Sequence, residues 1–158
     1  MYKFTLISSS NNDTMSIGFK LASYLNNSDT VILTGELGAG KTKFVEGFLS
    51  YFNLGDEISS PTFNIVNEYN HDNINIYHFD VYRLENVNEF FEIGGEEYFS
   101  KGICLIEWGE TIFSALPKDY IKITFEKDLE DENKRLLHFE LLGKYENLKE
   151  NFNENIKY

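Results

Sequence analysis

The sequence feature that most constrains the fold is the octapeptide GELGAGKT at residues 35–42, which satisfies the pattern G-x-x-x-x-G-K-[ST]. It follows the β-branched run TVILT at residues 30–34 and precedes apolar residues at helical spacing, Phe44, Val45, Phe48, Leu49 and Phe52. Glycines let backbone N–H groups turn inward around phosphate oxygens, and the helix that follows directs its positive end at the same anion. The order of strand, glycine loop and helix therefore predicts a phosphate-binding loop, with Lys41 at the terminal phosphates and the Thr42 hydroxyl on magnesium.

The other segments predict a mixed sheet flanked by helices. Asn12 and Asp13 are good helix N-caps in front of an amphipathic stretch. Residues 62–70 and 74–82 form a predicted hairpin, residues 87–99 a helix broken at Gly94 and Gly95, residues 103–106 a buried strand, and residues 121–125 and 137–141 a second hairpin. We therefore expect an α/β fold, a three-layer P-loop NTPase-like domain with a mixed parallel and antiparallel central sheet. This domain is expected to span residues 1–143, and a polar C-terminal tail, helical or disordered, to span residues 144–158.

Charge and cysteine content exclude several classes of protein. The chain has 14 Lys and Arg against 26 Asp and Glu, which gives a net charge of −12. It is therefore not expected to bind nucleic acid or an anionic membrane on its own. Its single cysteine, Cys104, can form neither an intramolecular disulfide nor a cysteine metal cage, which fits a reducing compartment. The first residues, MYKFTLISSSNNDT, lack the apolar stretch of a secretory signal, so we expect a cytoplasmic protein.

Two acidic residues are candidates to hold a metal beside the phosphate-binding loop. Glu107 closes the apolar run ICLIE and Asp80 ends the run INIYHFD. Either carboxylate reaches the loop if its strand runs parallel to residues 30–34, and either is otherwise a strand-terminal surface acid. Alternation also places His78 and Asp80 on one strand face. Such a pair either relays protons or, as we favour here, makes a structural hydrogen bond.

The absence of certain motifs limits the base that the chain is expected to bind and the reaction that it is expected to catalyse. The guanine-reading tetrapeptide N-K-x-D does not occur, which favours adenine as the base. The only arginines are Arg83 and Arg135, too few for the arginine-rich lid that kinases with this loop close over phosphates. Hydrolysis is therefore favoured, with a transition-state arginine supplied by one of these two residues or by a partner. Two alternatives stay open, a P-loop small-molecule kinase and a non-hydrolysing nucleotide-dependent interaction module.

Four motifs in order resemble one known family. They are GELGAGKT at residues 35–42, SPTF at 60–63, HFDVYRL at 78–84 and IEWGE at 106–110. Together they resemble the TsaE family, also called YjeE, the bacterial ATPases of tRNA threonylcarbamoyladenosine synthesis. The resemblance spans roughly residues 10–140.

The resemblance implies a role for each matching residue. It assigns ATP to Gly35, Glu36, Gly38, Ala39, Gly40, Lys41 and Thr42, with Thr14 and Arg135 as weaker candidates, and it assigns Mg²⁺ to Thr42, Glu107 and Asp80. It implies catalytic roles for Lys41, for Asp80 as the acid that orients the attacking water or holds a metal-bound water, and for Thr62 in the first switch segment. A rigid turn before a strand would equally explain the neighbouring Pro61. Trp108 resembles the family's tryptophan beside the metal-binding acid, although a lone tryptophan at a strand end more often packs.

The resemblance also implies partners. Family members bind and hydrolyse ATP, weakly when alone, and reset an assembly with the TsaB–TsaD heterodimer between turnovers of the tRNA modification. TsaD carries the transfer chemistry on the adenosine next to the anticodon. We therefore expect TsaD and TsaB as partners, tRNA to be reached only through the assembly, and neither DNA nor a membrane to be bound.

Overall fold

The structure is a computed structural model, and it describes residues 1–36, 38–58 and 64–153. Within these ranges the strands are β1 (Tyr2–Ser8), β2 (Thr30–Gly35), β3 (Val66–His71), β4 (Ile74–Asp80), β5 (Ile103–Glu107), β6 (Ile121–Lys127) and β7 (Arg135–Leu141). The α-helices are α1 (Asn11–Ala22), α2 (Lys41–Ser50), α3 (Val87–Glu92) and α4 (Lys149–Asn153). Short 3-10 helices are η1 (Gly55–Glu57), η2 (Gly95–Ser100), η3 (Gly109–Ala115) and η4 (Gly143–Leu148). No helix in the described ranges combines the length and apolar character needed to cross a membrane.

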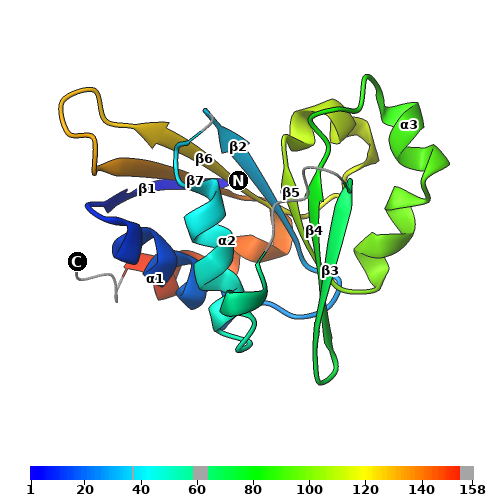
Figure 1. Cartoon of the computed structure of the whole chain (residues 1–158), viewed down its shortest axis with the longest axis horizontal. Helices are drawn as coiled ribbons and strands as arrows, with labels where there is room; N and C mark the ends of the chain where they lie inside the picture. The colour runs from blue at the N-terminus through cyan, green and yellow to red at the C-terminus, as the bar shows by residue number, and fades with distance from the viewer. Residues whose placement is uncertain (37, 59–63, 154–158) are drawn as a thin grey trace.

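The strands form one mixed sheet in the order β1-β7-β6-β2-β5-β4-β3. Strand β2 runs parallel to both β5 and β6, and β4 runs parallel to β5, whereas the pairs β1–β7, β6–β7 and β3–β4 are antiparallel (Figure 1). The predicted α/β class with a mixed sheet is confirmed. Because β2, β5 and β4 are parallel neighbours, their carboxyl ends meet at one edge, where Gly35, Glu107 and Asp80 lie.

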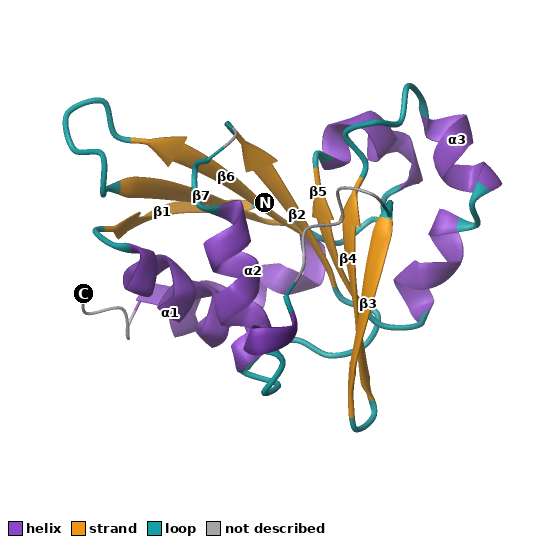
Figure 2. Ribbon diagram, in the orientation of Figure 1, coloured by secondary structure: helices purple, strands orange, loops and turns teal. Residues whose placement is uncertain are grey.

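Helices pack on both faces of the sheet (Figure 2). Val31 and Leu33 of β2 lie in the core formed with α1 and α2, while Ile32 between them lies in the second core with α3 and η3. Helices α1 and α2 approach closely at Gly47, where an added Cβ would lie 2.0 Å from the carbonyl oxygen of Met15. This close contact fixes the position of α2, and therefore of the loop that precedes it, relative to α1.

Several element boundaries differ from those expected. Strand β1 was not expected, although residues 2–8 alternate in burial along the strand. Helix α1 starts before Asn12, because Ser10 is its N-cap and its hydroxyl accepts a hydrogen bond from the backbone N–H of Asp13 at 3.1 Å. The break predicted at Gly94 and Gly95 within residues 87–99 is confirmed, since Gly94 has a φ of 71°; the part before it, α3, ends at Glu92, and the part after it is the 3-10 helix η2.

The polar tail is partly built into the domain. Residues 143–153 form η4 and α4, and Phe152 is only 1% exposed because it packs beside Phe4 and Phe139. Tyr145 is also buried. Two aromatic side chains therefore hold this polar segment against the domain. The remainder of the expected tail, residues 154–158, lies outside the described residues.

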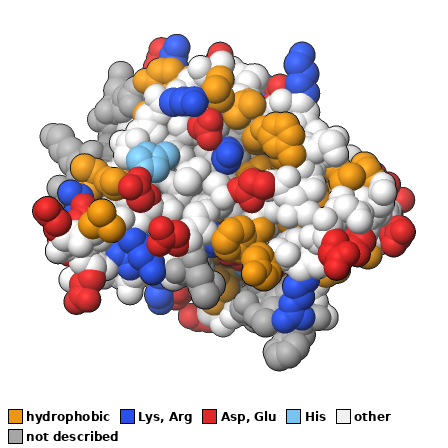
Figure 3. Space-filling view, turned by 90° about the horizontal axis from the view of Figure 1, so that it is seen from above, with side chains coloured by type: hydrophobic (Ala, Val, Ile, Leu, Met, Phe, Trp, Pro, Cys, Tyr) orange, Lys and Arg blue, Asp and Glu red, His pale blue; other side chains and the backbone are white. Residues whose placement is uncertain are grey.

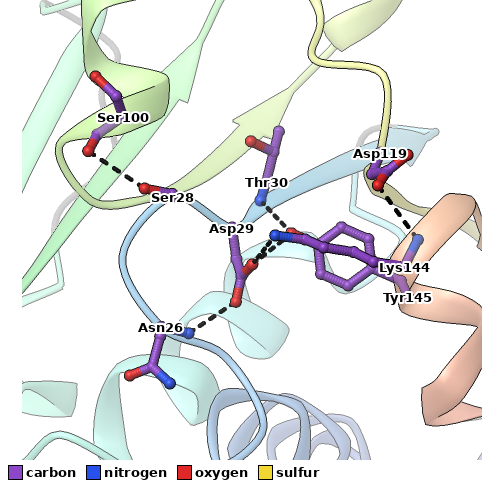
Figure 4. Close-up of polar contacts among 8 residues, drawn as sticks. All are labelled: Asn26, Ser28, Asp29, Thr30, Ser100, Asp119, Lys144 and Tyr145. Carbon is purple, nitrogen blue, oxygen red and sulfur yellow. Dashed lines mark hydrogen bonds and ion pairs between the residues drawn. The ribbon is translucent and has the colours of Figure 1, made fainter.

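A polar network anchors this segment to the start of β2 (Figure 4). The Tyr145 hydroxyl donates to Asp29 Oδ1 at 2.6 Å and accepts from the backbone N–H of Thr30 at 3.3 Å. Lys144 Nζ lies 3.1 Å from the same carboxylate, and the backbone N–H of Asn26 donates to its other oxygen at 2.8 Å. Burial, followed by the Asp29 carboxylate, raises the pKa of Tyr145.

Replacing Tyr145 by Phe is expected to lower the free energy of unfolding by about 1.5–3 kcal/mol, because a hydrogen bond to a charged group is lost. Lys144→Ala is the control, since its side chain is 55% exposed and its ion pair is expected to contribute less than about 1 kcal/mol. The difference between wild type and Tyr145→Phe should shrink above about pH 10, where tyrosine ionises in the unfolded chain but is held neutral in the folded one. Urea unfolding at pH 7 and pH 11 measures both effects. Equal losses in the two variants would contradict the role given to the hydroxyl.

Candidate nucleotide-binding site

The phosphate-binding loop joins β2 to α2 through three glycines with positive φ, Gly35, Gly38 and Gly40. Gly35 has a φ of 126°, and a Cβ there would lie 2.3 Å from the carbonyl oxygen of Phe125. Gly40 has a φ of 104° at the N-cap of α2, and no side chain in the described ranges caps that helix. The first-turn N–H groups of α2 are therefore available to an anion at the positive end of the helix.

Lys41 is turned back into this loop. Its side chain is 5% exposed, its Nζ donates to the carbonyl oxygen of Gly35 at 2.7 Å, and the ammonium lies 4.0 Å from the ring centroid of Trp108. Burial lowers the pKa of Lys41, and the carboxylates of Glu107, Asp80 and Glu110 act in the opposite direction. The loop thus holds a largely desolvated cation at the place where the terminal phosphates are expected.

Both candidate carboxylates reach the same edge of the sheet. Asp80 is the direct register partner of Glu107 on the neighbouring parallel strand, and Glu107 is that of Leu33 on β2. One oxygen of Asp80 is already engaged, because its Oδ1 accepts the backbone N–H of Tyr82 at 3.0 Å. The parallel arrangement on which both candidates depended is therefore present.

His78 pairs with Glu107 rather than with Asp80. Its Nε2 lies 2.7 Å from Glu107 Oε2, and the two side chains are 3% and 12% exposed. Sequence alternation correctly placed His78 and Asp80 on one face of β4, but the hydrogen bond crosses to the adjacent strand β5. A single strand's pattern could not reveal this partner, because it depends on the order of strands in the sheet.

A cavity of about 220 Å³ lies between the loop, α1 and β7. The residues that line it are Asn11, Gly38, Gly40, Lys41, Thr42, Lys43, Glu107 and Arg135. Five of these, Gly38, Gly40, Lys41, Thr42 and Arg135, are residues for which the sequence predicts nucleotide contact. Two of the lining residues, Thr42 and Glu107, are predicted metal ligands.

Several residues predicted to bind the nucleotide differ in their surroundings near this cavity. Arg135 is held at the β6–β7 turn, where its Nη1 donates to the carbonyl oxygen of Lys134 at 3.0 Å. Thr14 is buried and its hydroxyl lies 2.7 Å from that of Ser8, while Asn11 lines the cavity. Ala39 is buried within the loop, and its N–H donates to the carbonyl oxygen of Glu36 at 3.1 Å.

Two lysine side chains near the site were not predicted from the sequence. Lys43 lines the cavity from the first turn of α2, and a Cβ added at Gly38 would lie 3.3 Å from Lys127 Nζ. Lys43 directly follows the GKT of the motif and could have been noticed. Lys127 could not, because only the pairing of β6 with β2 brings its strand end beside the loop.

An aromatic pair, Trp108 and Tyr82, lies beside Lys41, and the tryptophan contacts the lysine. Trp108 follows β5 with a φ of 63°, and its ring centroid lies 5.3 Å from that of the exposed Tyr82. The sequence favoured packing for this tryptophan, whereas its ring also contacts the Lys41 ammonium. Arg83 is exposed on the turn beyond β4. The predicted switch segment, Ser60, Pro61 and Thr62, lies outside the described residues.

The oxygen donors at this edge suit a magnesium ion. Thr42, which carries a hydroxyl, and Glu107, which carries a carboxylate, line one cavity, and Asp80 is the register neighbour of Glu107. No group of three or more His, Cys, Asp and Glu side chains placed to hold a metal occurs in the part of the chain that the structure describes. Mg²⁺ in nucleotide sites is held by one or two carboxylates together with substrate phosphates, so this donor set fits it.

Comparisons with known proteins agree on one family. The family model described as "Threonylcarbamoyl adenosine biosynthesis protein TsaE" matches residues 8–136. The tRNA threonylcarbamoyladenosine biosynthesis protein TsaE of Treponema pallidum is 39% identical over 131 residues, covering 82% of this chain and 96% of that protein. Its namesake in Bacillus subtilis is 38% identical over 138 residues, covering 86% and 85%. The crystal structure of Bacillus subtilis YdiB superposes with a TM-score of 0.75 at 30% identity, covering 96% of this chain and 95% of that one.

Proposed function

The chain belongs to the TsaE family of threonylcarbamoyl adenosine biosynthesis proteins, and we propose that it is the ATP-binding and ATP-hydrolysing subunit of this tRNA-modification machinery. The observation that carries the proposal is the buried Lys41 ammonium beside the uncapped start of α2, in a cavity that also contains Thr42 and Glu107. This arrangement suits the terminal phosphates of a nucleoside triphosphate.

Each group at the site has a role in hydrolysis. The N–H groups of the loop and of α2 cradle the phosphates, and Lys41 neutralises charge on the terminal phosphoryl oxygens. Thr42 and Glu107 would hold Mg²⁺, whose contribution when bound is to neutralise charge that develops on the phosphate oxygens. Asp80 would orient the attacking water or a water bound to the metal. Thr62 would contact the terminal phosphate or the metal.

We further propose that this cycle resets a TsaB–TsaD complex between turnovers in the cytoplasm, and that tRNA is reached only through that complex. The net charge of −12 disfavours strong binding of tRNA by this chain alone. On the face shown in Figure 3, acidic and basic side chains of the described residues are interspersed, without the continuous basic stripe typical of phosphate-backbone binding.

The test is ATP turnover measured for the purified chain alone and with the TsaB–TsaD pair of the same organism. We expect slow turnover alone and an increase of about tenfold or more with the pair, because a partner orders switch segments. Trp108 is the only tryptophan, and it touches Lys41, so ATP binding should change its fluorescence. Absence of any increase in turnover, together with no repeated modification of tRNA, would contradict the proposal. Transfer of phosphate from ATP to a metabolite would instead point to a kinase.

A further inference from the structure

His78 is a buried polar residue at the carboxyl end of β4. It is 2% exposed, and its register partner on β5 is Leu105, two residues before Glu107. From there its Nε2 reaches Glu107 Oε2 at 2.7 Å. An ionised carboxylate only accepts hydrogen bonds, so the imidazole donates to it from Nε2.

The environment of the other ring nitrogen indicates that packing does not explain a histidine at this position. Its Nδ1 is buried and has no hydrogen-bond partner within the described ranges. A buried polar atom without a partner destabilises the folded chain, whereas an apolar side chain of similar shape would fill the same space without this cost. The bond to Glu107 is therefore the interaction that accounts for a histidine at this position.

Glu107 needs such a restraint because a cation lies close by. The carboxylate lines the cavity that contains Lys41, and it is the carboxylate that most strongly raises the pKa of that lysine. An unrestrained glutamate side chain could rotate to pair with the ammonium and would then be lost to a metal. The hydrogen bond from His78 engages Oε2 and leaves Oε1 free of it.

We propose that His78 is a positioning residue that holds the Glu107 carboxylate in the orientation that receives Mg²⁺ beside the bound phosphates. This inference rests on the proposed ATP and Mg²⁺ site. Residues that orient a metal ligand typically change metal affinity by about 10–100-fold when they are replaced. His78 thus determines the Mg²⁺ concentration at which the site binds a nucleotide together with Mg²⁺.

The test compares His78→Gln, whose amide nitrogen can occupy the place of Nε2, with His78→Asn, which is too short to reach Glu107. Binding of ATP is measured by calorimetry as a function of Mg²⁺ concentration, and again in EDTA. We expect His78→Asn to raise the Mg²⁺ concentration for half-maximal enhancement of binding by about 10–100-fold, and His78→Gln to restore most of it. Binding in EDTA should stay within about twofold for both. His78→Phe, which keeps the packing but cannot donate a hydrogen bond to Glu107, should resemble His78→Asn in its Mg²⁺ dependence.

His138→Gln is the matched control, because His138 makes a similar bond to Glu126, at 2.6 Å, on an exposed part of β7 outside the cavity. Suppose that wild-type binding depends on Mg²⁺, and that His78→Asn and His78→Phe fold but keep the same Mg²⁺ dependence. This result overturns the role of His78 and leaves the proposed metal site standing. The same shift in His78→Gln as in His78→Asn also overturns this role. If wild-type binding is independent of Mg²⁺, the proposed metal site itself is wrong.

Discussion

Replacing Lys41 by Ala is expected to reduce ATP turnover by about 10²–10³-fold, both alone and with the TsaB–TsaD pair. The reason is that Lys41 supplies a desolvated positive charge at the terminal phosphates, and a fixed charge of this kind in a water-poor site contributes more than one in water. Single-turnover and steady-state assays of phosphate release measure the loss.

The same substitution should leave the fold intact, which separates lost chemistry from unfolding. Burial lowers the pKa of Lys41, so the ammonium is held against a desolvation cost that alanine removes. The melting temperature should therefore be unchanged or higher. Lys101→Ala is the control, because Lys101 lies at the end of η2 with its side chain 57% exposed. Turnover by Lys41→Ala within threefold of the Lys101→Ala value would show that the loop does not act as described.

Replacing Glu107 by Gln should raise the Mg²⁺ concentration for half-maximal hydrolysis by about 100-fold or more. The substitution keeps the size of the side chain and removes its charge, and loss of a ligand is expected to exceed the cost of losing a residue that only orients one. Steady-state turnover across Mg²⁺ concentrations measures the shift.

Asp80→Asn is the informative comparison for Glu107→Gln. Asp80 already accepts the backbone N–H of Tyr82, and it does not line the cavity as Glu107 does. We therefore expect Asp80→Asn to lower maximal turnover with a smaller shift in Mg²⁺ dependence. A larger Mg²⁺ shift in Asp80→Asn than in Glu107→Gln would reverse the roles of the two acids.

The local order of the site could be predicted from the sequence because it is contiguous. Strand β2, the glycine loop and α2 follow one another within 21 residues, from Thr30 to Ser50, and each has its own pattern of residues. Glu107 could also be predicted, since a buried strand that ends in an acid has few possible positions in a parallel sheet. These predictions depend on the backbone and on short-range spacing.

The contacts between distant segments could not be predicted in this way. The pairing of His78 with Glu107, and the approach of Lys127 to Gly38, depend on which strands are neighbours, and strand order is a property of the whole sheet. The partners of the buried Phe152, which are Phe4 and Phe139 on two strands of the sheet, could not be predicted from the spacing of apolar residues in the tail. The place of Asn11 on the cavity wall follows from the packing of α1 on α2.

The contact between Lys41 and Trp108 has a consequence for how tightly nucleotide is held. A phosphate that recruits the Lys41 ammonium competes with two partners that the chain itself provides, the carbonyl oxygen of Gly35 and the face of the tryptophan ring. A cation over an aromatic face contributes about 0.5–2 kcal/mol, so this competition weakens nucleotide affinity by roughly 2–30-fold. In the proposed ATPase cycle, the same partners would recapture the lysine when phosphate departs and would so shorten the residence time of the product. The loop is in this sense self-competing, a property suited to repeated cycling rather than to storage of a nucleotide.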